Sequence, residues 1–104
     1  LRPTDEKVRK QLGGVLAAIG QFRESVQMLA GLALGPDDQF ELANLYAATK
    51  DFDAAVTAAR EYVKLDPQDP RGLRLLADVL SYRGNATKGD YAESLRLLRG
   101  LAEY

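Results

Sequence analysis

The chain repeats a helix–turn–helix pattern at intervals of about 34 residues, and this periodicity constrains its fold more than any other feature. The clearest copy runs through residues 42–46 (Leu-Ala-Asn-Leu-Tyr), a turn at 50–52 (Lys-Asp-Phe) and an ending at 65–67 (Leu-Asp-Pro). Within each segment, apolar residues recur every three or four positions, which predicts amphipathic helices. Such helix pairs cannot cover their own apolar surface, so the pattern predicts an all-α solenoid of stacked pairs.

The pattern resembles the tetratricopeptide repeat, in which large, small and aromatic residues occupy set positions of the first helix and alanine and proline mark the second. Those positions are filled here by Leu42, Ala43, Tyr46, Ala55 and Pro67. The resemblance covers essentially the whole chain. It implies a right-handed superhelical solenoid of three antiparallel helix pairs, taken from a longer array.

The same resemblance divides the chain, as a single domain over residues 1–104, into units at about 4–35, 36–69 and 70–104. Residues 1–3 are expected to close a preceding repeat. The first unit is short, since Leu12 and Leu42 are only about 30 residues apart, which predicts a trimmed second helix ending at 35–36. The third unit carries about five extra residues, which predicts an inserted surface loop at 83–88.

Each first helix carries a small residue that is expected to let its partner approach closely: Gly13, Ala43 and Ala77. Each is preceded by a leucine that we expect to be buried against the second helix: Leu12, Leu42 and Leu76. At the helix ends, Thr4 or Asp5 is expected to cap the first helix and Asp37 and Asp38 the third. Lys50 stands in a turn where glycine is common in the family.

Composition excludes several classes of function. Fourteen basic and fifteen acidic residues give a net charge of −1, which argues against a basic stripe for nucleic acid. No apolar run approaches the ~20 residues of a membrane helix. The sequence has no histidine and no cysteine, which removes most metal sites and the usual general bases. Residues 84–89 resemble a phosphate-binding loop, but Asp90 stands where the lysine belongs and no strand precedes it. The chain is therefore predicted to be no enzyme and to hold no metal or cofactor.

The resemblance further implies that the first helices line a concave groove for a partner protein or peptide. The residues expected to bind it are Lys10, Phe40, Glu41, Asn44, Arg71, Arg74, Asp78 and Tyr82. Phe40 and Tyr82 would serve as aromatic anchors, unless they only cover neighbouring helices. Arg83 and Lys88 of the inserted loop would add a contact, unless that loop is merely solvated.

One subclass of the family binds the C-terminal carboxylate of chaperones through basic residues and asparagines. Lys10 and Arg71 match its pattern, but Gly14, Glu41 and Leu75 do not, and Glu41 would repel a carboxylate. We therefore do not expect this chain to belong to that subclass.

These observations predict a non-catalytic protein–protein interaction scaffold. Arginine- and alanine-rich repeats without cysteine are similar in style to the periplasmic arrays of bacterial outer-membrane exopolysaccharide exporters such as the Pel system. That likeness implies a periplasmic location, with the cytoplasm as the alternative, a role in polysaccharide export and biofilm formation, and a polysaccharide-modifying enzyme as partner.

Other functions stay open. The groove could bind a glycan directly, or the chain could be a rigid spacer without a ligand. Recognition of RNA by a helical-repeat surface is disfavoured, because the acidic and basic residues nearly balance. Apolar surfaces at the two ends of the array also predict end-to-end association.

Overall fold

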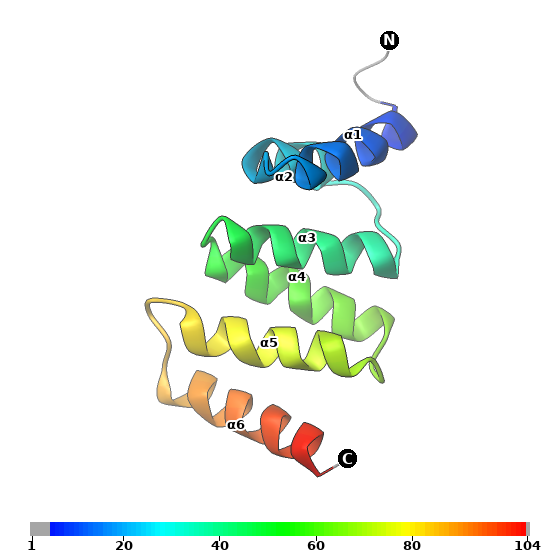
Figure 1. Cartoon of the computed structure of the whole chain (residues 1–104). Coiled ribbons are helices and arrows are strands. Elements are labelled where there is room, and N and C mark those ends of the chain that lie inside the picture. The colour runs from blue at the N-terminus through cyan, green and yellow to red at the C-terminus, as the bar shows by residue number, and fades with distance from the viewer. Residues whose placement is uncertain (1–4, 104) are drawn as a thin grey trace.

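The computed structural model describes residues 5–103 of the chain (Figure 1). The predictions for residues 1–3 and for Thr4 as a cap concern positions outside this range. Within it the chain forms helices joined by turns and short loops, with no strand. The helices are α1 (Glu6–Ala18), α2 (Phe22–Leu29), α3 (Pro36–Ala48), α4 (Phe52–Leu65), α5 (Pro70–Tyr82) and α6 (Lys88–Ala102).

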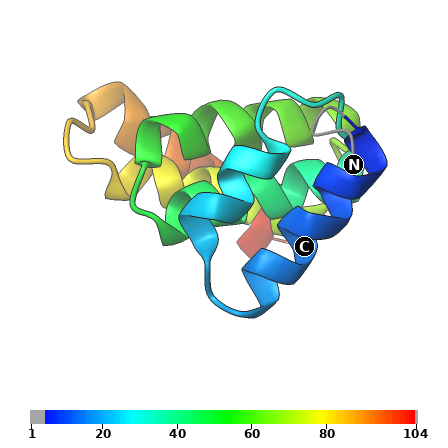
Figure 2. The ribbon, with the colours of Figure 1, turned by 90° about the horizontal axis from the view of Figure 1, so that it is seen from above.

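The helices form three antiparallel pairs that stack along the long axis of a 48 × 27 × 21 Å molecule (Figure 1). Seen from above, α1 and α2 run obliquely to the other helices (Figure 2). The predicted all-α solenoid is confirmed. None of the described helices has both the length and the apolar character that crossing a bilayer requires.

The larger hydrophobic core joins the second and third pairs. It contains Ala43 and Ala55 of the second pair together with Leu76, Val79 and Leu80 of α5, all at most 4% exposed. The small side chains of α4 let the larger side chains of α5 pack deeply against them. This interface anchors the solenoid, because burial of a leucine or valine contributes about 1.5–3 kcal/mol.

The first pair joins the second through a smaller cluster of Leu29, Leu42 and Leu45. Gly13 makes this possible, since a Cβ built on it would lie 2.9 Å from the Leu29 side chain. The second helix is shorter than predicted, because α2 ends at Leu29, well before the stop expected at 35–36. Gly31 has φ +83°, a left-handed conformation through which an α-helix cannot continue.

The burial predicted for the leucines holds in two units and fails in the first. Leu42 is 7% and Leu76 4% exposed, whereas Leu12 is 44% exposed. Val15, on the same face of α1, is also exposed. The prediction for Leu12 is wrong because α1 packs on α2 through Gly13. The apolar stripe of α1 that contains Leu12 and Val15 faces a side that no other described helix covers.

Helix ends follow simple capping chemistry. The Asp5 carboxylate accepts hydrogen bonds from the backbone N–H groups of Lys7 and Val8, so the predicted cap of α1 is confirmed. The prediction for α3 is wrong, since Gly35 is its N-cap and makes no side-chain bond. Asp37 and Asp38 instead lie in the first turn, where the helix dipole favours their charge.

Candidate functional site

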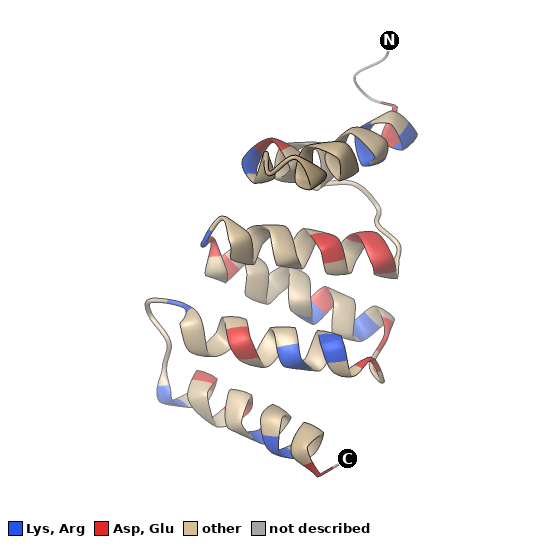
Figure 3. Cartoon of the chain, viewed as in Figure 1, with Lys and Arg blue, Asp and Glu red and all other residues tan. Residues whose placement is uncertain are grey.

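The predicted groove residues lie on the three first helices, as expected from the repeat. Lys10 is on α1; Phe40, Glu41 and Asn44 are on α3; Arg71, Arg74, Asp78 and Tyr82 are on α5. Acidic residues gather in the first half of α3 and basic ones in the first half of the adjacent α5 (Figure 3). The surface across these two helices therefore carries opposite charges side by side.

Phe40 and Arg71 belong to a packed cluster that joins the second and third units. The Phe40 ring lies 5.0 Å from the Tyr62 ring at 55°, and the Arg71 Cζ atom lies 5.0 Å from the Phe40 centroid. Asp69 accepts hydrogen bonds from the Tyr62 hydroxyl and, at 2.9 Å, from Arg71 Nη2. The Phe40 ring is thus half-buried, and the Arg71 guanidinium lies over it.

The ionisation states of this cluster follow from those bonds. The Arg71 guanidinium, followed by the Tyr62 hydroxyl, holds the pKa of Asp69 well below its usual range. In return the hydrogen bond to Asp69 raises the pKa of both Tyr62 and Arg71. Asp69 is an anion at neutral pH, and its charge keeps Arg71 oriented over the ring.

The other predicted residues differ in accessibility. Glu41 and Arg74 are exposed, and the Tyr82 ring is 67% exposed. Asn44 and Asp78 are half-buried, and the Asn44 amide donates to the Phe40 carbonyl at 3.1 Å. Lys10 on α1 is also half-buried. Glu41, Arg74 and Tyr82 are therefore open to a partner, whereas Arg71, although exposed, is engaged by Asp69.

Arg83 in the inserted segment is held by bonds within the chain. Its Nη2 and Nε atoms lie 2.7 and 3.1 Å from the two carboxylate oxygens of Asp90, and Nη1 lies 3.4 Å from Asp53. The Arg83 guanidinium, followed by the Thr87 backbone N–H, lowers the pKa of Asp90. Arg83 thus ties the segment to the first turns of α4 and α6.

The inserted loop is shorter than predicted, because α6 begins at Lys88. Thr87 and Asp90 form a capping box: the Thr87 hydroxyl accepts from the Asp90 N–H at 3.1 Å, and the Asp90 carboxylate accepts from the Thr87 N–H at 2.8 Å. This start adds a turn to α6 and leaves residues 83–87 as the loop. Lys88 is an exposed helical residue.

Two buried serines perform a structural task that sequence reasoning missed. The Ser25 hydroxyl donates to the Gly13 carbonyl at 2.6 Å, and the Ser94 hydroxyl donates to the Ala77 carbonyl at 2.8 Å. Ala55 occupies the equivalent position of the second unit. The shared position in the repeat was the signal that could have revealed this pairing of the two helices in a unit.

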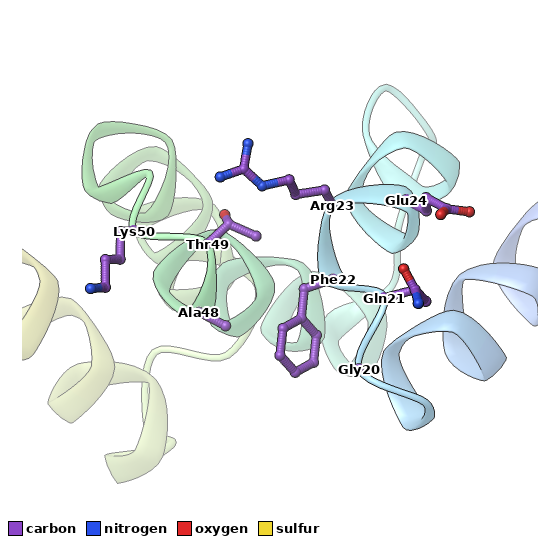
Figure 4. A pocket seen from close by; sticks show the side chains of 8 residues that line it. All are labelled: Gly20, Gln21, Phe22, Arg23, Glu24, Ala48, Thr49 and Lys50. Carbon is purple, nitrogen blue, oxygen red and sulfur yellow. The ribbon is translucent and has the colours of Figure 1, made fainter.

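A further concave region lies between the turns of the first and second units (Figure 4). It has a volume of about 620 Å³ and is lined by residues 20–24 and 48–50. Arg23 extends toward the end of α3, and the Glu24 carboxylate points the opposite way (Figure 4). The lining residues come from two separate turns, so helical periodicity did not indicate this pocket.

No metal-binding chemistry is assembled within residues 5–103. Nowhere in that range do three acidic, histidine or cysteine side chains come together as a possible metal site.

Comparison with known proteins bears on the family and the fold. Residues 36–79, which comprise α3, α4 and most of α5, match the family model of the tetratricopeptide repeat. No curated protein matches the sequence. Eighteen chains of solved structures match it. One of these, the crystal structure of MamA, aligns with 100% of this chain at a TM-score of 0.68 and 17% identity.

The chain spans 64% of the length of the MamA chain, and at this identity the likeness concerns the fold alone. The repeat match supports, in general terms, a role as a protein–protein interaction scaffold. This chain is thus a tetratricopeptide-like helical array, with the repeat itself matched over residues 36–79.

Proposed function

We propose that the chain is a non-catalytic scaffold that binds a segment of a partner protein across α3 and α5. The observation that carries the proposal is a row of side chains on α5. Arg74, Asp78 and Tyr82 are four residues apart, so they lie along one face of the helix. The row ends in Tyr82, which is 67% exposed and is therefore left largely uncovered by the described chain.

The chemistry of this row defines the partner it suits. Exposed tyrosine and arginine side chains are typical anchors of protein interfaces. Glu41, exposed on the neighbouring α3, adds a negative charge to the surface that carries the positive Arg74. A segment with both acidic and basic side chains and one apolar side chain for the ring would complement this surface.

The test is affinity capture from a lysate of the source organism, followed by titration of the purified partner. The wild-type chain is compared with the variant Arg74→Glu/Tyr82→Ala, whose two positions are exposed, so that the fold is retained. Phe40 is left intact because its ring packs on Tyr62. A matched control, Lys64→Glu/Leu65→Ala, makes the same kinds of change at exposed positions of α4.

We expect the wild type and the control to retain the partner and the groove variant to lose it. Equal retention by all three would refute the groove as the binding site. Capture of no protein by any bait would favour a rigid spacer.

Direct glycan binding is the second candidate function. Its support is the open Tyr82 ring, which offers a stacking surface one helical turn from the Asp78 carboxylate. Isothermal titration with oligosaccharides separates the two functions. A glycan site predicts heat that the Tyr82→Ala substitution abolishes, whereas a protein-binding groove predicts none.

We also propose a cellular setting, the periplasmic arm of a bacterial exopolysaccharide exporter, with a polysaccharide-modifying enzyme as partner. The support is the sequence style, arginine- and alanine-rich repeats without cysteine. Cell fractionation of the source organism tests the compartment. A cytoplasmic location, or unchanged biofilm formation after deletion, would refute this setting and leave the scaffold proposal intact.

A further inference from the structure

The helices α1 and α6 lie at opposite ends of the array (Figure 1), and each of them exposes an apolar face. On α1 the exposed residues are Val8 (43%), Leu12 (44%), Val15 (56%) and Ile19 (66%), which we term the α1 end face. On α6 they are Tyr91 (54%), Leu95 (49%) and Leu98 (41%), which we term the α6 end face. Each face follows helical spacing, so each is continuous.

The α1 end face occupies the positions that α5 uses to contact α4. The two helices share a register, since Asp5 and Asp69 are their N-caps. In this register Leu12 and Val15 correspond to Leu76 and Val79, while Val8 corresponds to Gly72. The α5 residues are buried in the core with α4, whereas their counterparts on α1 are open.

The α6 end face occupies the positions that α4 uses to contact α5. Ser94 and Ala55 set this register, because each lies at the crossing with its own first helix. Leu95 and Leu98 then correspond to Val56 and Ala59, which are 6% and 0% exposed. The two end faces are therefore the two halves of an interface that the chain already forms inside itself.

The side chains at one position differ in a compensating way. In the internal interface the large Tyr62 ring fills a notch at Gly72, where an added Cβ would lie 2.5 Å from the ring. The counterparts at the ends are Leu101 on α6 and Val8 on α1. A smaller residue replaces the tyrosine and a larger one replaces the glycine, so the two changes compensate in direction.

We propose that the α6 end face of one copy docks on the α1 end face of a second copy and reproduces the contact between α4 and α5. The two faces are different surfaces, so the contact is head-to-tail and leaves one free face on each copy. Association is therefore open-ended and rises with protein concentration. It does not involve Tyr82 or Arg74, so it is independent of the groove.

The test uses one charged substitution on each face, Val15→Glu on α1 and Leu98→Glu on α6. Both positions are exposed, so neither change buries a charge in the folded monomer. In sedimentation velocity up to about 1 mM protein, we expect the wild type to form oligomers of increasing size. Each variant alone should remain monomeric. Their equimolar mixture should form a dimer and nothing larger, because only one intact pair of faces remains.

Thr57→Glu, at an exposed position of α4 away from both end faces, is the matched control and should associate like the wild type. A wild type that stays monomeric at 1 mM, or a mixture of the two variants that stays monomeric, would overturn the proposal. Undiminished association of either variant alone would overturn it as well. The groove variant Arg74→Glu/Tyr82→Ala keeps both end faces, so the two proposals can fail separately.

Discussion

Lys50 is the position where a single change should stabilise the chain. It has φ +63°, the one positive φ of a non-glycine residue within residues 5–103. Its N–H donates to the Ala47 carbonyl at 3.0 Å, and the next N–H, of Asp51, donates to the Tyr46 carbonyl at 2.9 Å. This is the Schellman arrangement, whose left-handed position usually holds glycine. Gly20, with φ +85°, fills that position in the first unit.

The expected gain is the difference of two terms. A residue with a Cβ in the left-handed region costs about 1–2 kcal/mol. Glycine loses more chain entropy on folding, which offsets roughly 0.4–1 kcal/mol of that gain. Lys50→Gly should therefore raise the free energy of unfolding by about 0.5–1 kcal/mol. For a domain of this size the melting temperature should rise by roughly 4 °C.

Urea denaturation followed by circular dichroism measures this difference, with the slope against urea expected to stay unchanged. Lys50→Ala is the control, because it removes the same charge and side chain but keeps a Cβ at positive φ. The reverse change, Gly20→Lys, should cost about 1 kcal/mol through the backbone alone, since an added Cβ there meets nothing within 4 Å. If Lys50→Gly is no more stable than Lys50→Ala, the reasoning from φ is refuted.

Two further predictions concern a tight contact and an ion pair. Gly72→Ala should destabilise the chain by about 1–3 kcal/mol in the same assay, because the new Cβ would lie 2.5 Å from the Tyr62 ring. Gly100→Ala, in open space on α6, should be neutral or stabilising by up to ~1 kcal/mol, and equal effects of the two would contradict the packing argument. Since Arg83 lowers the folded-state pKa of Asp90, the stability from this carboxylate is present above its unfolded pKa near 4 and is lost as the pH falls through the lower folded value. Acid unfolding of Asp90→Asn should accordingly be less steep below pH ~4 than that of the wild type, and superimposable curves would count against the pair.

The candidate site shows where sequence reasoning reached its limit. Periodicity placed Phe40, Arg71 and Tyr82 correctly on first helices, because helix position follows from local spacing. Periodicity could not show that Arg71 covers the Phe40 ring while the Tyr82 ring stays exposed, because the exposure of each ring depends on side chains of the neighbouring unit. Nor could it show that the Arg83 guanidinium is held by Asp90 and Asp53, because these residues lie on two different helices.

The sequence by itself determined the helix pairs, the turns between them and the small residues at their crossings. These features depend on hydrogen bonds and side-chain sizes within one unit, which a local pattern records. Only the tertiary structure decided which apolar stripes are buried, as Leu12 and Leu76 demonstrate at equivalent positions with opposite exposure. Burial is a property of two surfaces, and the second surface lies in another unit whose stacking angle no local pattern specifies.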